Sequence, residues 1–344
     1  MQMKTAGIKA AIVGASGYGG AELMRLLSAH SHVVLSAVLA GSSAGKRVDE
    51  VYPEFSGRIG LTFEPLEADG LDRADVAFVS LPSGESMRVV PEILDRVPKV
   101  IDLSGDFRLK EPEQYEQFYQ HKHVAPHLLG KSVYGLPELN KSRISASPLT
   151  ANPGCYPTGA ILALLPALQH DIIEPKSIVI TSMSGTSGAG RASSLEMSFT
   201  EVHDNMRAYK VGTHQHIPEI QSVLSEAAGT EVVVSFIPHL VPMNRGIYTT
   251  IHAGLKASIS DEDLFGVYED AYASEPFVRV RRQVPQLKDV LRTNYCDIGL
   301  TIDRRSHHLI LLSVIDNLVK GAAGQAIQNM NLMCGLPEET GLCS

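Results

Sequence analysis

The sequence predicts an α/β chain of two domains, a doubly wound nucleotide-binding domain followed by an α+β domain. Three observations carry this prediction. A glycine-rich turn joins an apolar strand to a helix near the N-terminus, the first part of the chain alternates strand with helix, and strand-like runs outnumber helices after residue 155. A length of 344 residues with 44% hydrophobic content suits about two domains with separate cores.

The alternating part predicts a βαβ unit extended into a parallel sheet, because helical runs separate the strand runs. The predicted elements are strands at 8–13, 33–39, 76–81 and 100–103, a glycine turn at 14–20, and helices at 21–29 and 85–96. We expect this first domain to span residues 1–153.

The later part predicts an α+β domain with a mixed or mostly antiparallel sheet. Strands are expected at 177–183, 231–237, 246–253, 278–284, 297–302 and 309–314. Pro218 opens a helix that ends before Gly229, and Ser260 is a capping candidate for a helix at 261–273. A last helix is expected from 319 to 333, ending at Gly335.

Composition excludes several classes of function. The formal net charge is −8 and the basic residues are scattered, which disfavours nucleic-acid binding. No apolar stretch approaches the roughly 20 residues that span a bilayer, and no apolar signal segment opens the chain. The cysteines form no C-x-x-C pair, so we expect a reducing, cytoplasmic compartment. They are Cys155, Cys296, Cys334 and Cys343.

The glycine turn is the first chemical signal. Gly14, Gly17 and Gly20 follow a strand and open a helix, where the backbone can approach a pyrophosphate and the helix N-terminus supplies donors to it. This position favours a dinucleotide site over a plain tight turn. The candidate contacts of the turn are Gly14, Ala15, Ser16, Gly17, Tyr18 and Gly19.

The loop after the second strand indicates which dinucleotide binds. A carboxylate there would hold a free ribose 2′-hydroxyl, whereas cations would hold a 2′-phosphate. The loop has no carboxylate before Asp49, so we predict NADP over NAD. Its candidate contacts are Ser42, Ser43, Lys46 and Arg47. The alternative is that the two cations only solvate the loop.

The run 152–158, Asn-Pro-Gly-Cys-Tyr-Pro-Thr, places the Cys155 thiol at the expected start of an apolar helix. Pro157 suits the first helical position, and the positive end of the helix dipole favours thiolate over thiol. A small buried core cysteine is the competing interpretation. With a nicotinamide cofactor, an activated thiol suits the interconversion of a thioester and a thiohemiacetal by hydride transfer.

Such chemistry needs a base, and His214 and His216 are the candidates. Residues at alternate positions of an extended segment face the same side, so one imidazole can work while the other orients or binds. Spacing does not choose between them. A second group, His121, His123 and His127, lacks a completing cysteine or carboxylate, so we expect a solvated histidine cluster and no metal site.

Cations and backbone donors are candidates for binding an anionic substrate. Arg108 follows a strand of the first domain and Arg245 opens a strand of the second, and either suits a carboxylate or phosphate. Pairing with a structural carboxylate such as Asp106 is the alternative for each. The glycine-rich loop 184–191 offers backbone N–H groups or moves as a lid. Its candidates are Ser184 and Arg191 for substrate, and Ser187 and Gly188 for cofactor.

Taken together, these segments closely resemble the N-acetyl-γ-glutamyl-phosphate reductase family over nearly the whole chain. The segments that carry the resemblance are GASGYGGAEL, IDLSGDFRL, YGLPEL, NPGCYPT, SGTSGAGR, THQHIPEI, HLVPMNRG and DNLVKGAAGQA, in the family's order. The resemblance implies a Rossmann-type domain at 1–153, completed by a C-terminal helix within 317–344. It also implies an inserted catalytic and oligomerisation domain at 154–316, like that of aspartate-semialdehyde and glyceraldehyde-phosphate dehydrogenases.

The resemblance also implies roles for residues. Cys155 is similar to the family's nucleophile, the histidine pair to its base, and Asn317 to the residue that binds the nicotinamide amide. Arg108 is the strongest of the three candidate arginines. Pro82 and Ser83 border the cofactor in a loop where the family often has Leu-Pro-His-Gly, so an imidazole role is excluded there.

The reaction implied is NADPH-dependent reduction of N-acetyl-γ-glutamyl phosphate to the semialdehyde, through a Cys155 thioester with loss of phosphate, in arginine biosynthesis. The resemblance also implies a homo-oligomer, a dimer or tetramer. Two alternatives stay open: a sister reductase that acts on an aminoadipyl phosphate in lysine synthesis, and a non-catalytic NADP-sensing module.

Overall fold

The computed structural model describes residues 7–67, 69–191 and 194–342. The chain divides into two compact units, one formed by residues 1–153 with 322–344 and the other by residues 154–321. Residues 317–321 therefore lie in the second unit, whereas the terminal helix lies in the first. Cys343 is outside the described residues.

The first unit is built on a parallel six-stranded sheet of order β2-β1-β3-β4-β6-β5. Its strands are β1 (Ile8–Val13), β2 (Val33–Leu39), β3 (Val76–Val79), β4 (Val100–Asp102), β5 (Val133–Tyr134) and β6 (Leu149–Ala151). Its α-helices are α1 (Tyr18–Leu27), α2 (Val48–Val51), α3 (Ser86–Arg96), α4 (Pro112–Tyr119), α5 (Pro137–Ser145) and α10 (Gly324–Met333). The predicted parallel sheet is confirmed, and β5, β6, α2, α4 and α5 are additions to the prediction.

Both faces of this sheet are buried, because alternate residues of each strand enter different cores. Ala11, Val13 and Val79 pack in one core with α3 and with Tyr115 of α4. On the opposite face, Thr150 of β6 bonds to Met333 of α10. The unit is therefore doubly wound, as predicted, and the turns that follow β1 and β3 share the carboxyl edge of one sheet.

The second unit contains a mixed seven-stranded sheet of order β11-β12-β13-β10-β7-β9-β8. Its strands are β7 (Ile178–Ser184), β8 (Arg207–Ala208), β9 (Val234–Leu240), β10 (Ile247–Gly254), β11 (Val278–Arg281), β12 (Cys296–Asp303) and β13 (His308–Ile315). Its α-helices are α6 (Cys155–Gln169), α7 (Phe199–Val202), α8 (His216–Ala228) and α9 (Asp261–Tyr272). Among the described strands of this sheet, only the β11–β12 and β7–β9 pairs are parallel, which confirms the predicted α+β domain with a mixed sheet.

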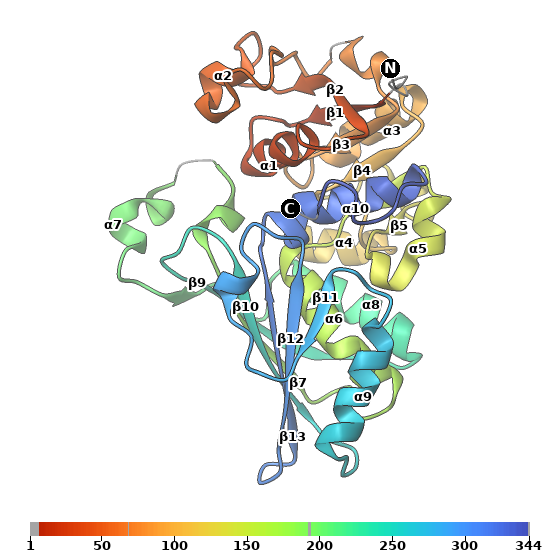
Figure 1. The fold of residues 1–344 in the computed structure, drawn as a ribbon, viewed down its shortest axis with the longest axis vertical. Helices are drawn as coiled ribbons and strands as arrows, with labels where there is room; N and C mark the ends of the chain where they lie inside the picture. The colour runs from red at the N-terminus through yellow and green to blue at the C-terminus, as the bar shows by residue number, and fades with distance from the viewer. Residues whose placement is uncertain (1–6, 68, 192–193, 343–344) are drawn as a thin grey trace. The chain divides into compact units, whose positions relative to one another are not determined.

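Helix α6 is the buried axis of this unit. Figure 1 shows α6, α8 and α9 on one side of the sheet and α7 standing apart from it. The side chains from Tyr156 to Leu168 are buried, and Tyr268 of α9 donates to the Ala163 carbonyl at 2.7 Å. The predicted Ser260 cap is confirmed, since its hydroxyl accepts from the Asp263 N–H at 3.0 Å. The burial of α6 and its hydrogen bond to Tyr268 fix the position of this helix, whose first residue is Cys155.

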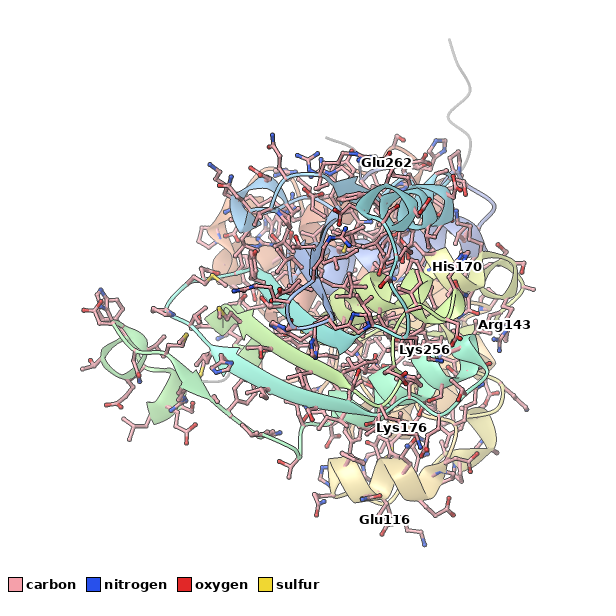
Figure 2. The ribbon with its side chains drawn as sticks, turned by 90° about the horizontal axis from the view of Figure 1, so that it is seen from below. Glu116, Arg143, His170, Lys176, Lys256 and Glu262 are labelled. Atoms are coloured by element: carbon pink, nitrogen blue, oxygen red, sulfur yellow. The ribbon has the colours of Figure 1, made fainter. Side chains whose placement is uncertain are left out.

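Several charged side chains form ion pairs on the outside of the second unit. Figure 2 shows Lys176 and Lys256 at the surface of the second unit, where they pair with Glu231 and Asp171. Within the described part of the chain, no helix is long and apolar enough to cross a membrane.

Candidate active site

Cys155 is the first residue of α6, so the prediction that the thiol opens a helix is confirmed. Gly154 is the N-cap with extended backbone, and the Thr158 hydroxyl donates to its carbonyl at 2.9 Å. The first N–H groups of a helix lack acceptors within the helix and carry partial positive charge. The half-buried Cys155 sulfur therefore lies where an anion is stabilised. Pro157, expected at the first helical position, is the third residue instead.

A carboxylate that the sequence analysis did not single out holds the backbone beside the thiol. The Glu219 Oε1 atom accepts a hydrogen bond from the Gly154 N–H at 2.8 Å, and Glu219 is buried. It lies three residues after His216 on α8, so both project from one face of that helix. The H-x-x-E spacing of His216 and Glu219 within the THQHIPEI segment is the sequence signal from which Glu219 could have been identified.

The two candidate histidines lie together, with ring centroids 4.7 Å apart. Their segment is a turn that enters α8 rather than the extended run expected, and His216 is the first helical residue. The His216 N–H donates to Nδ1 of His214 at 3.1 Å. That bond requires a lone pair on Nδ1, so the remaining proton of a neutral His214 ring is on Nε2.

Aromatic rings surround His214 and change its basicity. Tyr156, Tyr209 and Phe236 all meet its ring edge-on, at centroid distances of 5.6, 5.6 and 5.3 Å. Burial, and to a smaller extent the charge of Lys210, lower the pKa of His214 to about 3. A group with this pKa is a weak base, so His214 stays neutral at physiological pH.

A tyrosine pair lies beside the same helix start. The hydroxyls of Tyr156 and Tyr209 are 2.8 Å apart. Burial raises the pKa of Tyr209 to about 12, so both phenols keep their protons. Tyr209 also was not among the predicted site residues. No spacing in the sequence connects it to Cys155.

Asn317 links two loops of the second unit. Its Oδ1 atom accepts from the Gly246 N–H at 2.6 Å, and its Nδ2 atom donates to the Ser187 hydroxyl at 3.0 Å. The loop that carries Ser187 and Gly188 is a 3₁₀ turn, Thr186–Ala189, directly after the buried Ser184. This contact brings the predicted candidates Asn317, Ser187 and Gly188 together.

The two candidate arginines of the second unit, Arg245 and Arg191, differ in their surroundings. Arg245 forms a two-point contact with the buried Asp316 carboxylate, at 2.8 Å from Nε and 2.9 Å from Nη2. Asp316 also accepts from the backbone of Arg292 and Leu318. Arg191 is exposed at the end of the glycine-rich loop.

The glycine turn of the first unit has the shape of a backbone cradle. Gly14 has φ of +86°, and a Cβ there would lie 2.4 Å from the Ser80 carbonyl oxygen. A Cβ on Gly20 would lie 2.5 Å from the backbone of Ala15. The turn leads into the N-terminus of α1, where Tyr18 is the first residue and Gly17 the N-cap. The chain thus fits a pyrophosphate group, with Ala15, Ser16 and Gly19 in the same turn.

The loop after β2 is exposed and partly self-paired. Ser42 and Lys46 are exposed, and Ser43 is half-buried. The Arg47 guanidinium contacts Asp49 through Nε at 2.9 Å and Nη2 at 2.8 Å. That hydrogen bond lowers the pKa of Asp49.

The turn after β3 lies against the loop after β4. The Gly105 N–H donates to the Ser83 hydroxyl at 3.1 Å, and Pro82 precedes it on the surface. Arg108 donates from Nε to the Asn152 carbonyl at 2.8 Å and from Nη2 to the Leu103 carbonyl at 2.9 Å. These two bonds to backbone carbonyls hold the guanidinium in place.

The expected solvated histidine cluster is wrong for one of its members. His123 is buried, its Nε2 lies 2.8 Å from the Asp106 carbonyl oxygen, and its Nδ1 accepts from the Ala125 N–H. Burial accordingly lowers its pKa. Within residues 7–67, 69–191 and 194–342, no group of three or more metal-ligating side chains is found.

Comparison with protein-family models finds two matches. Residues 9–147 match the model described as semialdehyde dehydrogenase, NAD binding domain. Residues 155–317 match the model described as semialdehyde dehydrogenase, dimerisation domain.

Curated relatives match the chain at nearly full length. The N-acetyl-gamma-glutamyl-phosphate reductase of Pelotomaculum thermopropionicum is 51% identical over 338 residues, 97% of each chain. The enzyme of the same name from Geobacter sp. strain M21 is 47% identical, over 97% of this chain and 98% of its own.

Solved structures share the fold at low identity. Aspartate semialdehyde dehydrogenase II of Vibrio cholerae gives a TM-score of 0.74 at 19% identity, over 96% of this chain and 99% of its own. Aspartate semialdehyde dehydrogenase with NADP from Candida albicans gives 0.67 at 18%, over 95% and 98%.

Proposed function

The chain belongs to the N-acetyl-gamma-glutamyl-phosphate reductase family of semialdehyde dehydrogenases, and we propose that it reduces N-acetyl-γ-glutamyl phosphate with NADPH in arginine biosynthesis. The products are N-acetyl-L-glutamate 5-semialdehyde and phosphate. The observation that carries the proposal is Cys155 at the start of the buried helix α6, with Glu219 on the N–H before it. The mechanism follows from that placement.

Cys155 is the nucleophile. Its thiolate forms a C–S bond to the γ-acyl carbon, the C–O bond to the phosphoryl group breaks, and phosphate leaves with that electron pair. The N-terminal N–H groups of α6 stabilise the thiolate and the oxyanion of each tetrahedral intermediate. Glu219 keeps Gly154 in place, so the sulfur stays at the helix start.

His216 is the base, and His214 orients it. His214 is held neutral by burial, and its Nδ1 accepts the backbone N–H of His216, which fixes the start of α8 from which the His216 side chain projects. His216 takes the Cys155 proton before attack. After hydride transfer the oxyanion re-forms its carbonyl and expels the Cys155 thiolate, which takes back the proton that His216 holds. NADPH, when bound, supplies the hydride that reduces the thioester carbon.

The first unit holds the nucleotide, and we assign NADP rather than NAD. The glycine cradle at 14–19 takes the pyrophosphate, and Pro82 and Ser83 border the cofactor. In the second unit, Asn317 takes the nicotinamide amide, with Ser187 and Gly188 beside it. Ser42, Ser43, Lys46 and Arg47 take the 2′-phosphate. A dianionic phosphate competes with the single charge of Asp49 for the exposed Arg47.

Arg108 is the principal anchor for a substrate anion. Backbone carbonyls of Asn152 and Leu103 hold its guanidinium in place, whereas Arg245 contacts the buried Asp316 carboxylate. Arg191 and Ser184 are the further substrate candidates. Arg245 serves the substrate chiefly by holding Asp316, next to Asn317 in the chain.

The protein acts as a homo-oligomer, a dimer or a tetramer. The match of residues 155–317 to a dimerisation domain supports association. A projecting segment of the second unit supports it further, because Leu195 and Phe199 are 79% and 77% exposed. Met206 and Val211 of the same segment are more than half exposed. Large apolar side chains gathered in this way are typical of an interaction surface.

Replacement of the nucleophile tests the proposed reaction. Cys155→Ser keeps the size and hydrogen bonding of the side chain but removes the thiolate. We expect NADPH to bind with unchanged affinity and turnover of N-acetyl-γ-glutamyl phosphate to be lost. Substantial turnover in that variant would contradict the assignment of Cys155.

A further inference from the structure

A buried carboxylate outside the predicted site holds together two loops of the first unit. Asp106 lies in the loop after β4 and is fully buried. Its carboxylate accepts from the Gly84 N–H at 2.9 and 3.0 Å and from the Met87 N–H at 2.9 Å. The Tyr115 hydroxyl donates to it at 2.7 Å.

Asp106 replaces the missing side-chain cap of α3. The N-cap residue of that helix, Glu85, makes no side-chain capping bond within the described chain, and Met87 is its second residue. The cap therefore comes from a different loop, 19 residues away in the sequence. A carboxylate suits this place, because it accepts several charge-assisted bonds and is stabilised by the positive end of the helix.

The loop that carries Asp106 is itself fixed. The Ser104 hydroxyl accepts from the Asp106 N–H at 3.1 Å and donates to Asp102 at 2.7 Å. Gly105 has no space for a side chain, because a Cβ there would lie 2.1 Å from the Tyr119 hydroxyl. The Gly105 N–H then makes the second bond between the loops, to Ser83.

The same loop ends at Arg108, two residues after Asp106. We propose that Asp106 is a positioning residue that locks the cofactor-bordering turn 82–84 to the loop carrying the substrate-binding Arg108. This role rests on the proposed function of both loops. Asp106 touches neither cofactor nor substrate, and it acts through the Gly84 N–H and the backbone that leads to Arg108.

Asparagine at this position distinguishes the role from simple space filling. It has the shape of aspartate but one accepting oxygen, so its NH₂ group must face one of the present donors. We expect Asp106→Asn to raise the Kd for NADPH about tenfold, measured by fluorescence titration, because charge-assisted bonds to Gly84 and Met87 are weakened. The KM for the acyl phosphate should rise as well, with a smaller change in kcat.

Asp297→Asn is the matched control. Asp297 is a buried carboxylate of the second unit that pairs with Arg279 at 2.6 and 3.0 Å. The same substitution there should lower Tm but leave the Kd for NADPH within about twofold. If Asp106→Asn and Asp297→Asn lower Tm by similar amounts and neither changes the Kd for NADPH, Asp106 has only a structural role and the proposal is wrong.

Hydrogen exchange on the unmodified protein keeps the test independent of a variant's folding. The amides of Gly84 and Met87 should be protected without cofactor, because both bond to a buried carboxylate. Exchange at the rate of an unstructured peptide would overturn the proposal. Wild-type protein that binds NADPH but does not reduce the acyl phosphate would contradict the proposed function and leave this positioning test intact.

Discussion

At the residue scale, two neighbouring imidazoles lie in different surroundings, and we propose different roles for them. His214 meets three aromatic rings edge-on, and its Nδ1 accepts a hydrogen bond from the backbone N–H of His216. His216 begins a helix whose next turn carries Glu219, and the Glu219 carboxylate accepts the N–H of Gly154, the residue before Cys155. Spacing in the sequence could not make this division, because basicity depends on burial and on ring contacts between distant elements.

His216→Gln should lower kcat by about 10²- to 10⁴-fold, the usual contribution of a general base. Because the pKa of His214 is about 3, any kinetic pKa between 5 and 8 that disappears in this variant belongs to His216 or to its partner thiol. His214→Gln should cause a smaller loss and keep that pKa. Rates measured from pH 5 to 9 check both predictions. A larger loss of kcat in His214→Gln than in His216→Gln would identify His214 as the base.

Asp102 should make folding depend on pH. Burial, and then the nearby Asp106, raise its pKa from 3.8 to about 6. The folded state therefore holds a proton that the unfolded state has lost between these values, so stability falls as pH rises from about 4 to 6. The full loss is about 3 kcal/mol.

Asp102→Asn should remove this dependence and stabilise the protein above pH 6. Asparagine can still accept the Ser104 hydroxyl bond, but it has one accepting oxygen, whereas the Ser104 hydroxyl and N–H use both oxygens of Asp102. The dependence of stability on pH therefore reports the charge, and an offset that is the same at every pH reports the lost bond. Urea unfolding at pH 4, 5, 6 and 7 measures the effect. Parallel pH curves for variant and wild type would show that Asp102 is ionised without penalty.

At the element scale, a π-helical turn packs against the first residue of α6. The turn, Val319–Ala323, directly precedes α10 in the chain. A Cβ on its Gly321 would lie 2.9 Å from the Cys155 Cβ. The single helix predicted over 319–333 is thus divided into a π-helical turn and α10, and the π-helical turn contacts Cys155.

Gly321→Ala should displace the Cys155 side chain by a few tenths of an ångström. We expect kcat and the rate of iodoacetamide alkylation to fall about tenfold, because small misplacements of reacting groups are costly. Gly266→Ala on α9 is the control, since a Cβ there meets nothing within 4 Å. That change should keep activity and raise Tm slightly. Equal activity in both variants would show that the π-turn is not a constraint.

Elements with strong end signals could be predicted from the sequence. Ser260 capped α9 as expected, and the apolar runs of β1 and β2 have their predicted bounds. The start of α6 was expected too late, because proline suits any position of a first turn whose N–H groups have no acceptor. β5 and β6 are two and three residues long, too short for a periodic pattern.

At the scale of the whole molecule, the exposed apolar side chains at 195–211 suggest where subunits meet. This segment connects the loop of Ser187 and Arg191 to Tyr209 and the histidines. Subunit contact would therefore order both ends of the candidate site. We expect association and activity to be linked.

The double variant Leu195→Ser, Phe199→Ser should shift the protein to a smaller species in analytical ultracentrifugation and lower kcat in parallel. Val124→Ser is the control, because Val124 is 51% exposed in the first unit. It should change neither property. An unchanged sedimentation coefficient in the double variant would remove this segment from the interface.

The overall architecture and the motif residues were predictable because glycine spacing, apolar periodicity and helix-end signals are local. The contacts that join distant segments were not. Glu219 bonds to a residue 65 positions away, and Asp106 caps a helix that begins 20 residues before it. Neither contact has a periodic signature, and each depends on how loops meet in the folded units.

The most direct test of the central claim is acylation of Cys155 without reducing cofactor. The enzyme is mixed with N-acetyl-γ-glutamyl phosphate in the absence of NADPH, and phosphate release and the mass of the Cys155 peptide are followed. We predict a burst of one phosphate per site and an N-acetylglutamyl adduct on Cys155, both absent in Cys155→Ser. A burst that persists in the variant, or an adduct on another residue, would contradict the account.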